Sequence, residues 1–139
     1  MIVLDTNVVS ELQGRQHTER LLAWLDGYAI ETLFLTTITI AEIRFGIALL
    51  PGGRRRISLR HALERIEAEF EGRILGFSIA AAHLYGDLSA VRKLKGHSME
   101  TRNAMIAATC LAHGAALATR NTKDFEGLDL TLVNPFEEG

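Results

Sequence analysis

The sequence predicts one α/β domain with a parallel sheet, and three observations support this fold class. Short apolar segments of strand length alternate along the chain with longer segments of helical periodicity. The chain has 139 residues, 47% hydrophobic and 23% charged, which is the size and composition of one globular domain. Repeats, linkers and low-complexity segments are absent from the sequence, so we expect residues 1–139 to form a single domain. Strands that alternate with helices are typical of a parallel sheet covered on both faces.

The first half of the chain contains two predicted strands and four predicted helices. The strands are residues 2–4 and 33–37, and the helices are residues 6–12, 21–25, 39–50 and 54–70. The first strand is a short apolar run that delivers Asp5 to its carboxyl end. Thr39 is the expected N-cap of the third helix, which is predicted to stop at the Pro51-Gly52-Gly53 break.

The second half is predicted to contain three strands and two helices. The strands are residues 73–76, 115–119 and 130–133, and the helices are residues 78–95 and 103–113. Gly96 is expected to end the first of these helices, and Gly114 stands where a helix C-cap glycine belongs. About five strands are therefore expected in the sheet.

Charge and motif content exclude several classes of protein. The net charge of −2 argues against a protein that binds nucleic acid through its overall field. No G-x-S-x-G, P-loop or G-x-G-x-x-G motif occurs. The five histidines lack metal-ligand spacing and are interpreted as surface or cap residues, and the single Cys110 as a packed apolar side chain. Without an apolar run that could span a bilayer or a signal-peptide pattern, no membrane association is expected and the cytoplasm is the default location.

Polar residues gather where the predicted strands end. Asp5 follows the first strand, residues 119–124 follow the fourth, and Glu42 lies near the start of a helix between apolar neighbours. In an open α/β sheet this edge is where ligands bind, and several oxygen ligands together suit Mg²⁺ or Mn²⁺. Each acid also has a structural interpretation: Asp5 as a helix cap, Glu42 as a first-turn acid, and Asp124 as a turn or cap residue.

Three segments together resemble the successive motifs of PIN domains, most closely those of the VapC and FitB toxins. They are MIVLDTNVVSEL, ITIAEIRFGIALL and NAMIAATCLAHGAALATRNTKDFEGLDLTLVNPFE, in this order and at the family's spacing. The resemblance covers essentially the whole chain. It implies a three-layer α/β/α sandwich with a mainly parallel sheet, Mg²⁺- or Mn²⁺-dependent cleavage of RNA, a homodimer, and a small antitoxin as partner.

The resemblance also implies a set of site residues. The implied catalytic residues are Asp5, Glu42, Asn103 and Asp124, and the implied metal site comprises Asp5, Glu42, Asn103, Asn121 and Asp124. Thr119 matches a small hydroxyl residue that accompanies these acids in relatives, and Thr6, Thr119 and Arg120 are candidate substrate-binding residues. Arg102 is a second candidate for holding phosphate.

The third acidic position departs from the family pattern. Relatives usually carry Asp there, whereas this sequence has Asn103. An amide oxygen can ligate a divalent ion but brings no charge, so weaker metal binding and attenuated cleavage are expected. Glu100, one helical turn upstream, is a candidate to compensate.

Two other functions compete with a metal-dependent ribonuclease. The first is a PIN-fold binding module that holds antitoxin or RNA without cleaving. The second is a different α/β hydrolase or phosphatase with a coincidental acidic rim. Apolar residues around the Pro51-Gly52-Gly53 break, namely Leu49, Leu50, Ile57 and Leu59, are candidates for the surface that forms a homodimer.

Overall fold

The computed structural model describes residues 1–14 and 19–137. His17, interpreted above as a surface or cap residue, lies outside the described residues. The strands are β1 (Ile2–Leu4), β2 (Leu33–Thr36), β3 (Ile74–Leu75), β4 (Ala116–Ala118) and β5 (Leu132–Val133). The α-helices are α1 (Thr6–Gln13), α2 (Glu19–Asp26), α3 (Thr37–Ala48), α4 (Arg54–Glu69), α5 (Ile79–Leu94) and α6 (Thr101–His113), and two 3₁₀ helices are η1 (Ile30–Thr32) and η2 (Thr122–Phe125).

The described strands form one five-stranded parallel sheet in the order β3-β2-β1-β4-β5. β1 lies at the centre, with Ile2 paired to Leu33 of β2 on one side and to Ala116 of β4 on the other. The chain builds outward from β1 to one edge and then returns to build the other edge. The strand order therefore reverses beside β1, and ligands of α/β sheets bind at the carboxyl ends of the strands at such a point. The expectation of a mainly parallel sheet of about five strands is confirmed.

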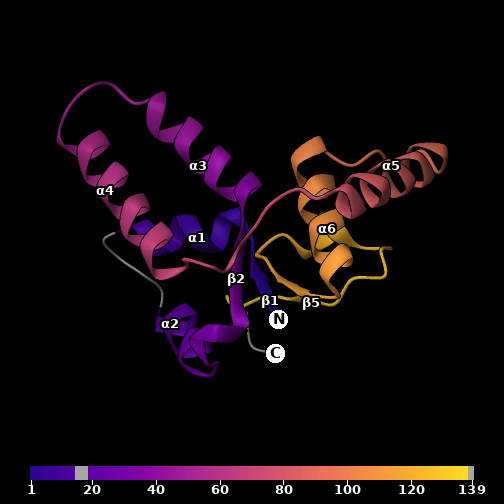
Figure 1. The fold of residues 1–139 in the computed structure, drawn as a ribbon, viewed down its shortest axis with the longest axis horizontal. Helices are drawn as coiled ribbons and strands as arrows, with labels where there is room; N and C mark the ends of the chain where they lie inside the picture. Colours follow the sequence, from indigo (N-terminus) through magenta and orange to yellow (C-terminus); the bar gives the residue numbers. More distant parts are fainter. Residues whose placement is uncertain (15–18, 138–139) are drawn as a thin grey trace.

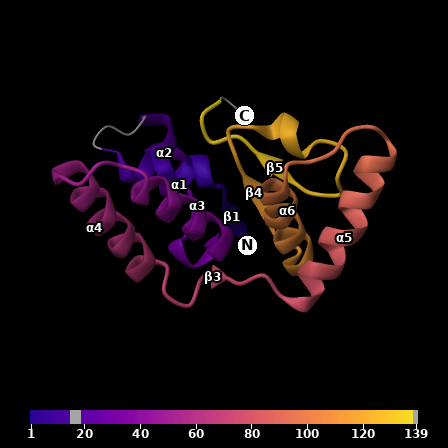
Figure 2. The ribbon, with the colours of Figure 1, turned by 90° about the horizontal axis from the view of Figure 1, so that it is seen from above.

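Helices cover both faces of the sheet, which gives three layers. Successive residues of β1 face opposite sides: Leu4 packs in one core with α1–α4, and Val3 packs in the other with α6. Figure 2 shows α1–α4 on one side of the sheet and α5 with α6 on the other. Cys110 is fully buried in the second core, as expected for a packed apolar side chain.

The helix boundaries hold one correction. Thr36, not Thr39, is the N-cap of α3, because its Oγ1 accepts a hydrogen bond from the backbone N of Thr39 at 3.1 Å. The helix therefore begins at Thr37, and Glu42 lies in its second turn. The interpretation of Glu42 as a first-turn acid stabilised by the helix dipole is wrong for this reason.

The other boundaries agree closely with the expectations. The last helix, α6, begins at Thr101, two residues earlier than predicted, and places Asn103 in its first turn. Gly114 follows α6 with φ of 63°, the left-handed conformation that glycine adopts without strain. The 3₁₀ helices were not predicted. Among the described residues, none of the helices is long and apolar enough to cross a bilayer.

Candidate functional site

Parallel pairing of β1 with β2 and β4 brings three chain segments to one edge of the sheet. Leu4 is paired with Ala118, so Asp5 and Thr119 emerge side by side from β1 and β4. The backbone N of Asp5 continues this pairing by donating to the carbonyl of Ala118 at 2.9 Å. On the other side, β2 ends at Thr36 and leads directly into α3, which carries Glu42. Figure 1 shows α1 and α3 starting at this edge.

Asp5 is a buried carboxylate that receives three hydrogen bonds. Its Oδ1 accepts from the backbone N of Thr6 at 2.9 Å, so Asp5 is also the N-cap of α1, as its structural interpretation expects. Its Oδ2 accepts from Thr119 Oγ1 at 2.7 Å and from Asn7 Nδ2 at 3.2 Å. Burial nevertheless raises the pKa of Asp5, because lost solvation outweighs these hydrogen bonds. A cation bound beside Asp5 would stabilise the ionised form of this buried carboxylate.

Glu42 is linked to Asp5 through Thr6. The Thr6 hydroxyl donates to Glu42 Oε1 at 3.1 Å, while its backbone N holds Asp5. A further hydroxyl, from the buried Thr39, lies 3.1 Å from that of Thr6 and fixes its position. Partial burial raises the pKa of Glu42, and the charge of Asp5 acts in the same direction. The two acids are therefore near neighbours that repel each other when both are ionised.

Arg102 supplies a positive charge to this edge. Its Nη1 lies 3.5 Å from Glu42 Oε2, and its Nε lies 2.6 Å from Glu100 Oε1. Its side chain is 52% exposed, so solvent screens both ion pairs. Asn103, the next residue of α6, is partly buried. The ion pair between Arg102 and Glu42 thus places the first turn of α6, which contains Asn103, beside α3.

The segment after β4 contributes Asn121 and Asp124. The backbone N of Asn121 donates to Thr119 Oγ1 at 3.1 Å, which folds the chain back over the edge of the sheet. Asp124 follows in η2, where it is exposed and where the buried Phe125 anchors the turn. The negative charge of Asp124 raises the pKa of Asp5, so it lies within electrostatic reach of that carboxyl.

The candidate substrate-binding residues have structural contacts of their own. Thr119 is fully buried against Asp5, and Thr6 joins the two acids. The Arg120 guanidinium lies 3.9 Å from the centre of the Phe136 ring and 3.8 Å from a carboxylate oxygen of Glu11. In this structure, Arg120 therefore fastens the C-terminal segment to the sheet.

The sequence places Asn7 among the polar residues after the first strand but indicates no role for it, and the structure shows that it ties the two central loops together. Its Nδ2 donates to Asp5, and its Oδ1 accepts from the backbone N of Arg120 at 3.1 Å. Its place two residues after Asp5, the acid that follows the central strand, was the available signal. The pairing of Glu42 with Arg102 was missed, because it depends on how α3 and α6 pack.

The donor set fits a divalent ion of the Mg²⁺ or Mn²⁺ type. Carboxylate oxygens of Asp5 and Glu42, with the nearby Asp124, are the hard ligands that such ions prefer. Burial raises the pKa of Asp5 and of Glu42, so ionising both acids at this edge costs free energy that a bound cation would offset. Residues 1–14 and 19–137 contain no group of three or more His, Cys, Asp or Glu arranged to hold a metal. An ion here would therefore depend on amide oxygens or water to complete its shell.

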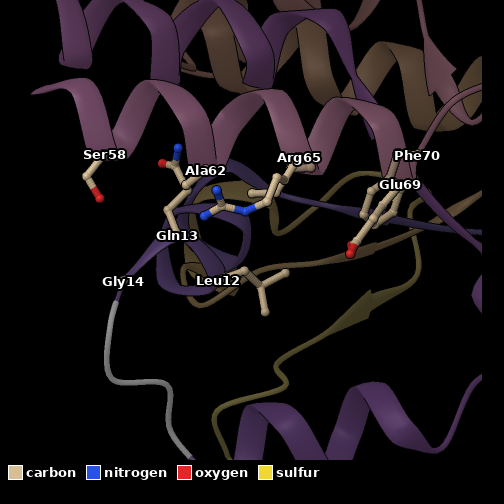
Figure 3. Close-up of a pocket in the computed structure, with 9 residues that line it drawn as sticks. Leu12, Gln13, Gly14, Ser58, Ala62, Arg65, Glu69 and Phe70 are labelled. Atoms are coloured by element: carbon tan, nitrogen blue, oxygen red, sulfur yellow. The ribbon is translucent and has the colours of Figure 1, made fainter.

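A cavity of about 420 Å³ lies away from this edge. It opens between the C-terminal end of α1 and the length of α4, and it contains the side chains of Gln13, Arg65 and Glu69 (Figure 3). It has one carboxylate and lies at the opposite end of α1 from Asp5. Its chemistry does not resemble that of the strand edge.

The family model for the PIN domain matches residues 2–129, which includes the whole acidic edge. The chain belongs to the PIN-domain family. It is 45% identical to the VapC ribonuclease Y4jK of Sinorhizobium fredii over 99% of both chains. It is 40% identical to the toxin FitB of Neisseria gonorrhoeae over 99% of this chain and 100% of the relative. The expected resemblance to the VapC and FitB toxins is confirmed.

A solved structure supports the same fold. The chain matches a protein in the structure of FitAB bound to an IR36 DNA fragment with a TM-score of 0.91 and 38% identity. The match covers 100% of this chain and 98% of that one. The three-layer PIN-like architecture is therefore confirmed, with Asp5 at the carboxyl end of its central strand.

Proposed function

We propose that this PIN-domain protein is a metal-dependent endoribonuclease and the toxin of a type II toxin–antitoxin pair. The observation that carries the proposal is the joining of Asp5 and Glu42 through Thr6 at the carboxyl edge of the sheet. The relatives named a VapC ribonuclease and toxin FitB support the activity and the biological class. The match over residues 2–129, together with the packing of Phe136 on the first core, supports a single domain.

The proposed metal site comprises Asp5, Glu42, Asn103, Asn121 and Asp124, with Asp5, Glu42, Asn103 and Asp124 as the catalytic residues. Held by these residues, Mg²⁺ or Mn²⁺ would lower the pKa of a coordinated water and would stabilise charge on the phosphate oxygens. Thr119 and Asn7 hold the Asp5 carboxylate in place through hydrogen bonds, so its orientation is set before a substrate arrives. Thr6 does the same for Glu42. We propose that Thr6, Thr119 and Arg120 bind the RNA substrate and that Arg102 also contacts an RNA phosphate.

Asn103 attenuates this activity in our proposal. It stands where relatives usually carry Asp, and among the described residues Asp5, Glu42 and Asp124 are not close enough together to form a ready three-acid metal site. Glu100 is occupied by Arg102 at 2.6 Å, which opposes a compensating role as a ligand. The site then has one carboxylate fewer than is usual, and its affinity for divalent ions is lower.

A small antitoxin is the proposed protein partner, and a homodimer the proposed assembly. Related solved structures are toxin–antitoxin complexes, FitAB among them. An antitoxin that places a basic side chain at the acidic edge would make charge-assisted contacts with Asp5 and Glu42. The same edge would then serve both substrate and inhibitor.

A catalytically weakened binding module is the second candidate, favoured by the Arg102–Glu42 ion pair. Arg102 Nη1 lies 3.5 Å from Glu42 Oε2, so this ion pair partly offsets the charge of Glu42 without a metal. Such a protein would act through its antitoxin or RNA without cleavage. Binding of RNA in a chelator, with no cleavage on addition of Mn²⁺, would identify it.

The experiment compares cleavage of a single-stranded RNA by the parent chain, Asp5→Ala and Asp26→Ala. Asp26 is an exposed acid at the end of α2 and serves as the matched control. With Mn²⁺ or Mg²⁺, we expect cleavage by the parent and by Asp26→Ala, a loss on the order of 100-fold in Asp5→Ala, and none in a chelator. Equal cleavage by the parent and Asp5→Ala would overturn the proposal, because the cleavage would then not depend on Asp5, as with a contaminating nuclease. Preferential hydrolysis of a small phosphate ester would instead indicate a phosphatase.

A further inference from the structure

An apolar pocket of about 280 Å³ lies between α3 and α6, directly beside the acidic edge. Its lining residues are Ile38, Ala41, Glu42, Phe45, Arg102 and Met105. We call it the α3–α6 pocket. The four residues from α3 stand at positions i, i+3, i+4 and i+7 and therefore share one face of the helix. Glu42 belongs both to this pocket and to the proposed metal site, so an occupant of the pocket lies next to the reacting phosphate.

Phe45 is the unusual residue of this pocket. Its side chain is 62% exposed, although an aromatic ring is stabilised by burial. It lies one helical turn after Glu42, beside Ile38 and Ala41. An exposed aromatic face within one turn of a candidate metal ligand is positioned to receive a flat apolar group from a bound molecule.

The charges around the pocket favour RNA as the source of that group. Single-stranded RNA alternates flat nucleobases with anionic phosphates, and its bases stack on aromatic rings and on guanidinium planes. Phe45 offers the ring, while Arg102 offers a half-exposed guanidinium at the same pocket. Met105 and Ile38 complete an apolar wall. A nucleoside next to the scissile phosphate would meet these groups together, because Glu42 lines the pocket and also belongs to the proposed metal site.

We propose that the α3–α6 pocket binds one unstacked nucleobase of single-stranded RNA, with Phe45 as its stacking platform and Arg102 at its rim. This inference rests on the proposed function, since it places the base beside the phosphate that the metal site cleaves. The walls are mainly apolar, so the pocket recognises the presence of a base more than its identity. Base stacking is tolerant of sequence for the same reason.

The test is a binding cycle with short single-stranded RNA, measured in a chelator so that no cleavage occurs. One set of RNAs is intact, and in the others a single abasic ribose is moved one position at a time. For the parent, one abasic position should weaken binding on the order of tenfold. Phe45→Ala should lose a similar factor on intact RNA and lose nothing more at that position. Phe45→Tyr, which keeps the ring, should bind as the parent does.

Leu94→Ala is the control, because Leu94 is an exposed apolar residue on α5 and outside the pocket. Thermal denaturation of each variant establishes that it is folded. Binding of intact RNA by Phe45→Ala at the parent's affinity would overturn the proposal. So would a loss of affinity from the abasic position that is as large in Phe45→Ala as in the parent. An effect of Phe45→Ala on antitoxin binding alone would overturn it as well and would assign the pocket to the protein partner. A failure of the proposed function appears separately, as equal RNA cleavage by the parent and Asp5→Ala with Mn²⁺.

Discussion

The ionised side chain of Asp5 destabilises the metal-free fold, although the proposed function requires it. It is 4% exposed, and desolvation raises its pKa above the ordinary value of 3.8 in the folded protein. Between the two pKa values, the Asp5 carboxyl of the folded state therefore retains a proton that the unfolded state has released. Stability that is present below the ordinary pKa is lost as the pH rises through the folded-state pKa. At neutral pH, the ionised carboxylate destabilises the metal-free fold.

Asp5→Asn should therefore raise the melting temperature of the metal-free protein at pH 7. The difference in melting temperature between variant and parent should shrink as the pH is lowered toward 4, because the parent becomes protonated there. The charge of Asp5 raises the pKa of Glu42, so removing it also favours ionisation of Glu42, and the difference reports on the two acids together. Thermal denaturation in a chelator across this pH range measures it. A variant less stable than the parent at pH 7 would show that the hydrogen bonds from Thr119 and Asn7 outweigh desolvation.

Asn103→Asp should act in the opposite direction and restore metal binding. An anion in place of a neutral ligand should strengthen Mn²⁺ binding by about 1–3 kcal/mol, roughly 5- to 150-fold, and should raise RNA cleavage. The added charge repels Asp5 and Glu42, so the metal-free variant should be slightly less stable and should gain more stability from Mn²⁺. Calorimetric titration and cleavage of one RNA by both proteins measure this. Equal metal affinity and equal cleavage would place Asn103 outside the site.

The acids and the contacts that hold them differ in how far the sequence determines them. Asp5 follows a strand and Glu42 lies within the motif ITIAEIRFGIALL, so both positions could be predicted from local pattern. The hydrogen bond from Thr6 to Glu42 joins residues 36 apart in sequence, and the Arg102–Glu42 pair joins residues on different helices. Such contacts depend on side-chain rotamers and helix packing, which single-sequence patterns do not specify.

At the scale of elements, the β2–α3 junction positions Glu42. Thr36 ends β2 and caps α3 through the 3.1 Å bond to the backbone N of Thr39. The sequence predicted this helix but assigned its cap to Thr39, because both threonines are good caps and the strand was expected to run to residue 37. Tertiary packing decides which threonine caps the helix, since the Thr39 hydroxyl lies 3.1 Å from the Thr6 hydroxyl and Thr36 is left as the cap. Element type follows from periodicity, whereas the exact boundary follows from such competition.

Loss of this cap should affect both stability and activity. Thr36→Val keeps the shape but removes the hydroxyl, and should lower the unfolding free energy by about 1 kcal/mol. Ser78→Ala removes a matching cap from α5, where Ser78 accepts from the backbone N of Ala81 at 3.1 Å. Both variants should melt a few degrees lower, but Thr36→Val alone should also reduce RNA cleavage, because α3 carries Glu42. Equal cleavage by the two variants would contradict a positioning role for the junction.

At the scale of the whole molecule, the α3–α4 pair presents apolar side chains to solvent. Leu49 is 69% exposed and Ile57 is 56% exposed, near the loop that joins the two helices (Figure 1). Leu59, also expected on this surface, packs partly against the first core instead. Most hydrophobic residues of the chain thus fill the two cores on either side of the sheet, whereas Leu49 and Ile57 stay exposed at this end of the α3–α4 pair. An exposed apolar patch of this kind is typical of a protein–protein interface.

The proposed homodimer should use this surface. At micromolar concentration, light scattering should give a mass of about 31 kDa, twice the 15.3 kDa of the chain. Placing charges in the patch with Leu49→Lys and Ile57→Lys together should shift the mass toward the monomer, because burying unpaired cations in an interface is costly. Leu22→Lys adds a charge at an exposed apolar residue of α2 and should leave the dimer intact. A parent protein that remains monomeric at this concentration, with no change in assembly when the antitoxin is added, would count against both the dimer and the antitoxin partner.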